Sequence, residues 1–138
     1  PGFVRLSSQA LRCSMRREEL YMADIVEAAD AIRRFLAHID RDAFLHDDLL
    51  CSAVLQKLTI IGEAAARLPR EFRERHREIE WADIIAFRNI AVHAYFAVDR
   101  SIVWVAATQE APGVKRMVAD VLRREYPEAE PPDAPQGN

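Results

Sequence analysis

Apolar residues recur every three or four positions along most of the chain, which is the spacing of one face of an α-helix. In residues 18–39 they form a single stripe, made of Tyr21, Ile25, Ala28, Ile32, Phe35 and Ile39. Glu18 and Glu19 precede this stripe, where carboxylates interact favourably with the positive end of a helix dipole. The pattern predicts one long helix and then a loop over residues 38–48.

A second helix is predicted between an aspartate cap, Asp47 or Asp48, and the helix-terminating Pro69. Its buried face would contain Leu50, Val54, Leu58, Ile61, Ala65 and Leu68. The next stretch, "PREFRERHR" in residues 69–77, indicates a short basic helix that has its proline in the first turn.

Two further helices complete the pattern. One covers residues 81–95, "WADIIAFRNIAVHAY", and is nearly apolar. The other begins at a cap on Asp99, is kinked or broken at Pro112, and continues to about residue 124. The sequence contains no run of strand-like alternation. It therefore predicts an all-α fold, an up-and-down bundle of four to five helices.

Composition divides the chain into one folded domain and two ends. The 138 residues are half hydrophobic and include 4 glycines, so residues 15–124 suit a single helical domain in which Gly62 permits close helix packing. Residues 1–14 look unlike the rest and precede a credible start at Met15, so we interpret them as a non-native or disordered extension. Residues 125–138 are acidic and rich in proline, which predicts a disordered tail.

The formal charge of −3 provides no overall basic field, so any RNA contact must rest on a local patch. Cys13 and Cys51 lack the spacing of a metal or redox pair, and no apolar run approaches the ~20 residues of a membrane span. These features favour a reducing, cytoplasmic setting. His38, His46 and His76 have no ligand-like spacing, which predicts a protein without a metal.

Apart from Asp83, four polar residues interrupt the apolar segment 81–95, namely Arg88, Asn89, His93 and Tyr95. Buried polar groups need partners or a purpose, which makes this cluster the candidate active site. A helix turns about 100° per residue, so Asn89 and His93 share a face while Arg88 and His93 are roughly 140° apart. Either the helix ends between them, or a second chain completes a composite site.

These residue types suit attack on a phosphodiester. Histidine titrates near neutrality and can move the protons of a 2′-hydroxyl and of a leaving 5′-oxygen, while arginine holds the phosphate oxygens. Asn89 can fix the tautomer of His93. One histidine per chain is one proton-transfer group too few, and a two-fold dimer would supply the second. The structural alternative is a satisfied interface histidine, a surface arginine and a half-buried tyrosine.

The pattern Arg88-x-x-x-x-His93-x-Tyr95 resembles the motif of the HepT-like toxins, in the HEPN superfamily of small helical ribonucleases. The stretches "YMADIVEAADAI", "LTIIGEAAARLPREFRERH", "EIEWADIIAFRNIAVHAYFAVD" and "IVW" are similar to that family in the same order. The resemblance covers about residues 15–124. Ala94 is a mild departure, because relatives often have a polar or acidic residue there.

The resemblance implies a HEPN-like homodimer with the motif at its interface. It implies a metal-independent endoribonuclease, the toxin of a toxin–antitoxin pair, in which Arg88 and His93 carry catalysis and Asn89 supports them. It also implies a partner, a minimal nucleotidyltransferase antitoxin of the MntA type that transfers AMP from ATP onto Tyr95. ATP would be used only by the antitoxin, and the chain itself would need no cofactor. Phosphates added beside Arg88 would neutralise it and repel RNA.

Further candidate residues precede the motif. Glu63 is a carboxylate on an apolar stretch, where it can line the cleft, orient Arg88 or contact the antitoxin; a structural ion pair is at least as good an interpretation. Arg67, Arg70 and Arg73 belong to a basic run. They either form a phosphate-holding rim for RNA or pair with acidic residues four positions away on a solvated helix.

Two function classes besides a ribonuclease stay open at this point. One is a non-catalytic helical adaptor that docks a minimal nucleotidyltransferase, with the motif as a protein-binding or nucleotide-binding surface. The other is a purely structural dimerisation bundle. Toxicity on expression without the partner separates the nuclease from the adaptor, and modification of Tyr95 separates both from the structural bundle.

Overall fold

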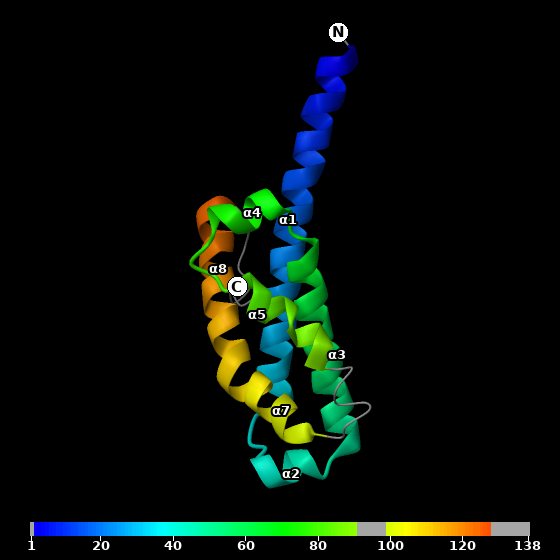
Figure 1. Cartoon of the computed structure of the whole chain (residues 1–138), viewed down its shortest axis with the longest axis vertical. Helices are drawn as coiled ribbons and strands as arrows, with labels where there is room; N and C mark the ends of the chain where they lie inside the picture. The colour runs from blue at the N-terminus through cyan, green and yellow to red at the C-terminus, as the bar shows by residue number, and fades with distance from the viewer. Residues whose placement is uncertain (1, 91–98, 128–138) are drawn as a thin grey trace, which may run out of the picture.

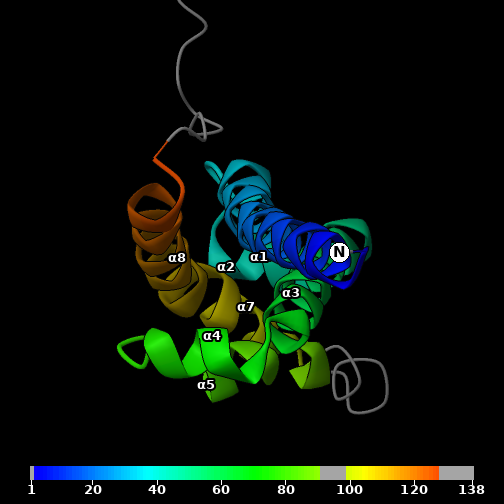
Figure 2. The same cartoon turned by 90° about the horizontal axis from the view of Figure 1, so that it is seen from above.

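Three long helices form the framework of the protein in its computed structural model (Figure 1). They are α1 (Gly2–Phe35), α3 (Asp48–Arg67) and α8 (Ala111–Glu125). α1 packs against both of the others, and the view from above shows it between them (Figure 2). The structure describes residues 2–90 and 99–127, with side chains from residue 17 onward.

The fourth segment of the bundle consists of short helices. From the end of α3, helices α4 (Arg70–Arg75), α5 (Trp81–Ile85) and α7 (Arg100–Val105) lead back to the opposite end of the bundle (Figure 1). α3 and α8 therefore run one way, while α1 and the short helices run the other. Throughout the described ranges the chain forms helices, turns and loops without a strand, which confirms the predicted all-α fold.

The predicted stripe on α1 is confirmed in its middle and wrong at its end. Ile25, Ala28 and Ile32 are buried in the core. However, α1 ends at Phe35 rather than continuing to Ile39. The chain turns at His38, whose φ of 63° lies in the left-handed region, and this reversal directs the backbone away from the axis of α1.

The segment predicted as a loop, residues 38–48, contains a helix, α2 (Arg41–Leu45). The carboxylate of Asp40 caps it by accepting the N–H of Ala43 at 2.8 Å. Phe44 is fully buried, with its ring 5.3 Å from the ring of Trp104. Burial of this one aromatic side chain stabilises the helix. A single buried residue is too short a pattern to appear as hydrophobic periodicity in the sequence.

The predicted caps are present. The Asp47 carboxylate accepts the N–H of Leu50 at 2.9 Å and begins α3, which ends at Arg67 just before Pro69. At α7, the carboxylate of Asp99 accepts the N–H of the second helical residue. Short polar side chains thus satisfy backbone donors that have no partner inside the helix.

Two helix boundaries differ from the prediction. The helix expected over residues 81–95 is interrupted by a turn at Ala86, after which residues 87–90 are helical again. The kink expected at Pro112 is a π-helical stretch, η1 (Ala106–Glu110), and the chain stays helical from α7 into α8. Proline lacks an N–H and clashes with the carbonyl four residues before it, so the preceding turn widens instead of breaking.

α3 is long and apolar enough to cross a membrane by length and composition alone. Its apolar face is accounted for by the core, because Val54, Leu58, Ile61 and Ala65 are completely buried in the bundle. A core helix of a bundle passes the same test of length and composition.

The proposed ends of the domain stay predictions. α1 already begins at Gly2, within the segment interpreted as an extension, so the backbone there continues the helix. The prediction of a disordered tail falls on residues 125–138, and residues 128–138 lie outside the described ranges.

Candidate active site

The backbone at Arg88 lies directly on α3 at Gly62. A Cβ atom added to Gly62 would meet the backbone nitrogen of Arg88 at 2.7 Å and the carbonyl oxygen of Ile85 at 3.1 Å, both too close. Only a residue without a side chain permits this approach. The interpretation of Gly62 as a close-packing residue is therefore confirmed, and the crossing places Arg88 against a rigid helix.

Arg88 and Glu63 are brought together across this crossing. The Arg88 Nη1 lies 3.7 Å from the Glu63 Oε1, and the two side chains are 42% and 48% exposed. An ion pair this exposed contributes only about 0–1 kcal/mol, because water screens both charges. Glu63 can orient the guanidinium, yet its hold is weak enough for a phosphate to replace it.

The other residues of the motif are described only in part. Asn89 follows Arg88 in the same helical turn, and its side chain is exposed. His93 and Tyr95 lie in residues 91–98, outside the described ranges. Their approach to Arg88 and their roles in catalysis and modification stay predictions.

The basic run divides between two helices. Arg67 is exposed on α3, one turn beyond Glu63 on the same face, which places it at the edge of the candidate site. Arg70, on α4, pairs with Glu74 at 3.1 Å, as the solvated-helix interpretation predicts. Arg73 is partly buried, and its Nε has no hydrogen-bond partner among the described residues. Of the three, Arg67 is the best placed to extend a phosphate-binding rim from Arg88.

The three histidines outside the motif contribute to the fold through local contacts or a turn. His76 is buried, its Nε2 lies 2.8 Å from a Glu125 carboxylate oxygen, and its carbonyl accepts the indole N–H of Trp81. His46 contacts a backbone carbonyl of α2, and His38 forms the turn after α1. Within the described ranges no group of three or more His, Cys, Asp or Glu side chains could hold a metal ion. Independence of metal stays a prediction.

The opposite side of the Arg88 segment faces a groove of ≈ 520 Å³, which we call the acidic groove. It is lined by Glu80, Asp83, Ile84, Ala86, Phe87, Ile90, Glu110, Val114 and Met117. A smaller hollow adjoins it, because both include Ile90 and Glu110, and contains Ile102 and Val105. Met117, Ile102 and Val105 are 38–46% exposed, an unusual amount for large apolar side chains that lie together.

Sequence reasoning missed a second groove, which we call the basic groove. Helices α1, η1 and α8 form it, and its cations are Arg33, Lys115, Arg116 and Arg123. A partial signal exists, because Lys115, Arg116 and Arg123 recur at seven- and eight-residue spacing and so share one side of α8. Only the packing of α1 against α8 adds Arg33 to the set.

The model of the ribonuclease HepT-like family matches residues 25–121, which includes the site and most of the bundle. The chain belongs to this family. A "Probable ribonuclease HepT" of Thermococcus cleftensis is 36% identical over 100 residues, which are 72% of this chain and 91% of that protein. A "Putative RNase" of Caldanaerobacter subterraneus is 32% identical over 111 residues, which are 80% and 99% of the two chains. No solved structure gives a significant match.

Membership of the HepT-like family confirms the resemblance carried by the motif and its flanks. It supports a ribonuclease with RNA as substrate, the coarser part of the predicted function. The homodimer, the antitoxin and the modification of Tyr95 are not tested by these matches, and they are taken up as proposals below.

Proposed function

We propose that this protein is a metal-independent endoribonuclease that acts in the cytoplasm as the toxin of a toxin–antitoxin pair. The observation that carries the proposal is the position of Arg88, which packs against α3. Its backbone is fixed by the crossing at Gly62, while its guanidinium is half-exposed beside one weakly held carboxylate. A pre-positioned, accessible cation is what phosphate chemistry requires.

In the proposed reaction the RNA supplies its own nucleophile. His93 of one protomer takes the proton of a 2′-hydroxyl, and the 2′-oxygen bonds to the adjacent phosphorus. The bond between that phosphorus and the 5′-oxygen breaks, and the His93 of the partner protomer gives the leaving oxygen a proton. Arg88 stabilises the additional negative charge on the phosphate oxygens, and Asn89 supports the tautomer of His93.

The proposed mechanism needs a homodimer, and the acidic groove supports one. Phe87 and Ile90 of the motif segment line this groove, and the exposed side chains Ile102, Val105 and Met117 lie in or next to it. Apolar surface of this kind marks interaction sites. A two-fold contact here would bring two motif segments together, so that each supplies one imidazole.

We further propose that a minimal nucleotidyltransferase of the MntA type neutralises the toxin. The Tyr95 hydroxyl would attack the α-phosphorus of ATP, pyrophosphate would leave, and Tyr95 would carry AMP. The added phosphate would pair with the guanidinium of Arg88, neutralise its charge and exclude RNA from the site. Mass spectrometry of Tyr95, after the chain is mixed with the partner and ATP, tests this step. If Tyr95 stays unmodified, the proposed transfer of AMP is wrong.

The principal experiment is cleavage of tRNA and mRNA in EDTA by the wild type, Arg88→Ala and His93→Ala. Both substitutions should lower the rate at least about 100-fold, the usual effect of losing a proton-transfer group or a transition-state charge. Arg34→Ala is the matched control for arginine, because Arg34 is also exposed and pairs with one carboxylate, Asp30, at 3.5 Å. It should cleave like the wild type. His46→Ala is the corresponding control for histidine.

Equal cleavage by all of these proteins would contradict the catalytic roles. The adaptor alternative predicts that expression without the antitoxin is harmless, whereas the ribonuclease should arrest growth and His93→Ala should relieve the arrest. A circular dichroism spectrum shows that the harmless variant is still folded.

A further inference from the structure

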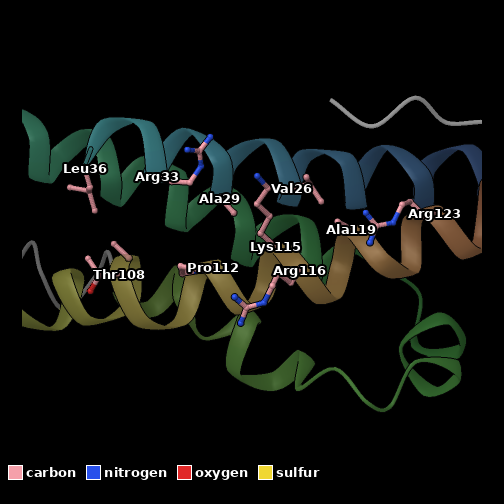
Figure 3. A pocket seen from close by; sticks show the side chains of 11 residues that line it. Val26, Ala29, Arg33, Leu36, Thr108, Pro112, Lys115, Arg116, Ala119 and Arg123 are labelled. Carbon is pink, nitrogen blue, oxygen red and sulfur yellow. The ribbon is translucent and has the colours of Figure 1, made fainter. Parts of the chain in front are cut away.

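The basic groove is an open cavity of ≈ 690 Å³ along the seam of α1 and α8 (Figure 3). Its apolar floor consists of Val26, Ala29 and Leu36 from α1, Ala107 from η1, and Pro112 and Ala119 from α8. Figure 3 shows the charged side chains along both walls of this floor. Cavities of this size and composition are typical of ligand sites rather than of packing defects.

All four ionisable side chains that line the basic groove are cations, namely Arg33, Lys115, Arg116 and Arg123. The acidic groove has the opposite composition, since its ionisable lining residues are Glu80, Asp83 and Glu110. The chain as a whole has a formal charge of −3. The basic groove is thus a local patch of the kind that a net-acidic RNA-binding protein needs.

The present partners of these cations leave room for a ligand. Arg33 pairs with Asp30 at 2.8 Å and Arg123 with Asp120 at 3.8 Å, and the two arginine side chains are 68% and 63% exposed. The Arg123 pair is exposed on both sides and therefore weak, and the charge of Asp30 is already shared among Arg33, Arg34 and Lys115, so a phosphate can compete for either guanidinium. Lys115 also bonds to Asp30, at 2.9 Å, and ties the two walls together.

The spacing of the cations favours an extended polyanion over a single small anion. Lys115 and Arg123 are eight residues apart on α8, which is about 12 Å along the helix axis. Figure 3 shows Arg33 and Arg123 far apart along the groove, with Lys115 and Arg116 between them. One phosphate group bonds only to donors within about 3 Å, so these cations match successive phosphates of a chain.

We propose that the basic groove binds a single-stranded segment of RNA. The proposal rests on the proposed function, which makes RNA the substrate, and adds a second contact on another seam of the bundle. The groove lies between α1 and α8 (Figure 2), whereas Arg88 packs against α3 at Gly62. Its aliphatic floor contacts base faces without reading their edges, so binding tolerates many sequences and depends strongly on salt.

The test uses two pairs of adjacent arginines as matched variants. Arg33 and Arg123 line the groove, while their neighbours Arg34 and Arg124 do not. The neighbours are similarly exposed and also pair with Asp30 and Asp120, and Arg124 has one further carboxylate partner, Glu78, at 3.2 Å. The double variants Arg33→Ala/Arg123→Ala and Arg34→Ala/Arg124→Ala therefore change charge and composition equally. Each is prepared as the full chain and checked for an unchanged circular dichroism spectrum.

Binding is measured by fluorescence anisotropy with a labelled 2′-O-methyl RNA of ten nucleotides over a range of salt concentrations. This RNA has no free 2′-hydroxyl, so binding is read separately from cleavage. The groove variant should bind about tenfold or more weakly at low salt. The slope of log K against log salt is negative, and its magnitude should decrease by about 1.4 in the groove variant, because two phosphate contacts are lost at about 0.7 each. The neighbour variant should behave like the wild type.

Equal losses in both double variants would overturn the proposal, because the effect would then be one of general charge. Unchanged binding in the groove variant, or no binding by the wild type, would also overturn it. Cleavage of unmodified RNA by the same proteins is scored independently. If the groove variant binds RNA like the wild type, the groove proposal fails. If the same variant still cleaves RNA while His93→Ala does not, the proposed function nevertheless stands.

Discussion

α8 separates two grooves of opposite charge. Arg116 lines the basic groove beside α1, and the next residue, Met117, lines the acidic groove beside α5. A helix turns about 100° per residue, so neighbours in sequence can belong to different surfaces. The contrast between the two grooves shows that the net charge of the whole chain does not predict the charge of either groove. One side of α8 presents cations, and the other presents carboxylates and exposed apolar side chains.

The two grooves therefore suit different partners. The exposed apolar side chains of the acidic groove and its adjoining hollow are typical of a protein interface. The basic groove combines an apolar floor with cations along its length, which suits a nucleic-acid strand. Three predictions test this division and one tests the crossing at Gly62, ordered from the largest expected effect to the smallest.

Met117→Glu should separate the proposed dimer into monomers and abolish cleavage. An unpaired carboxylate buried at an interface costs about 3 kcal/mol or more, which is over 100-fold in Kd. Sedimentation velocity measures the oligomeric state, and the RNA cleavage assay measures the consequence. A variant that stays dimeric would show that the acidic groove is not the interface, and a wild type that is monomeric would remove the dimer itself.

Gly62→Ala should destabilise the protein and misplace Arg88. The new methyl group would lie 2.7 Å from a backbone nitrogen, which cannot move as a flexible side chain can. Overpacking of this kind costs roughly 1–3 kcal/mol. Gly113→Ala is the control, because its methyl would meet only the end of the Arg116 side chain, at 3.9 Å. That change should be neutral or stabilise the helix by up to about 1 kcal/mol in denaturant unfolding.

Arg116→Glu should weaken binding of the 2′-O-methyl RNA about tenfold at low salt and leave the oligomeric state unchanged. It reverses a charge in the basic groove, whereas Met117→Glu adds a charge to the acidic groove one residue away. The two variants should therefore show opposite patterns in anisotropy and sedimentation. The same pattern in both would mean that the two grooves do not act separately.

Asp30 should make the seam of the basic groove sensitive to acid. A hydrogen bond from Lys115, and then one from Arg33, lower the pKa of Asp30 below its ordinary value. The carboxylate therefore stabilises the folded state by about 1 kcal/mol or less above its unfolded pKa, and this contribution is lost as the pH falls through its folded pKa.

Asp30→Asn should remove that part of the acid-side loss of stability in urea unfolding. Because the Asp30 carboxylate would then no longer compete with phosphate for Lys115 and Arg33, the same variant should bind RNA a few-fold more tightly at neutral pH. A variant that is less stable and also binds RNA more weakly would contradict the role given to these cations.

Much of the fold could be predicted from the sequence because it is encoded locally. The cap at Asp47, the end of α3 before Pro69 and the buried face of α3 each depend on neighbours a few residues away. α2 could not be predicted, because it depends on a contact between Phe44 and Trp104, sixty positions apart. The turn at Ala86 likewise follows from how the segment crosses α3 rather than from a local breaker such as proline or glycine.

The candidate site was predicted in part. The motif indicated Arg88, and the sequence already offered Glu63 as one way to orient it. That these two side chains meet follows from the crossing at Gly62, which joins residues about twenty-five positions apart. Arg70 shows the reverse case, since its pairing with Glu74 is a local helical contact that the spacing alone anticipates.

The sequence by itself determined that this chain is helical, where α3 and α7 begin and α3 ends, and that it belongs with the HepT-like ribonucleases, because periodicity, caps and motifs are properties of neighbouring residues. The tertiary structure alone decided that Arg33 faces the cations of α8 and that Arg88 rests on Gly62. Such surfaces arise when helices distant in sequence pack side by side, and no local pattern contains that information.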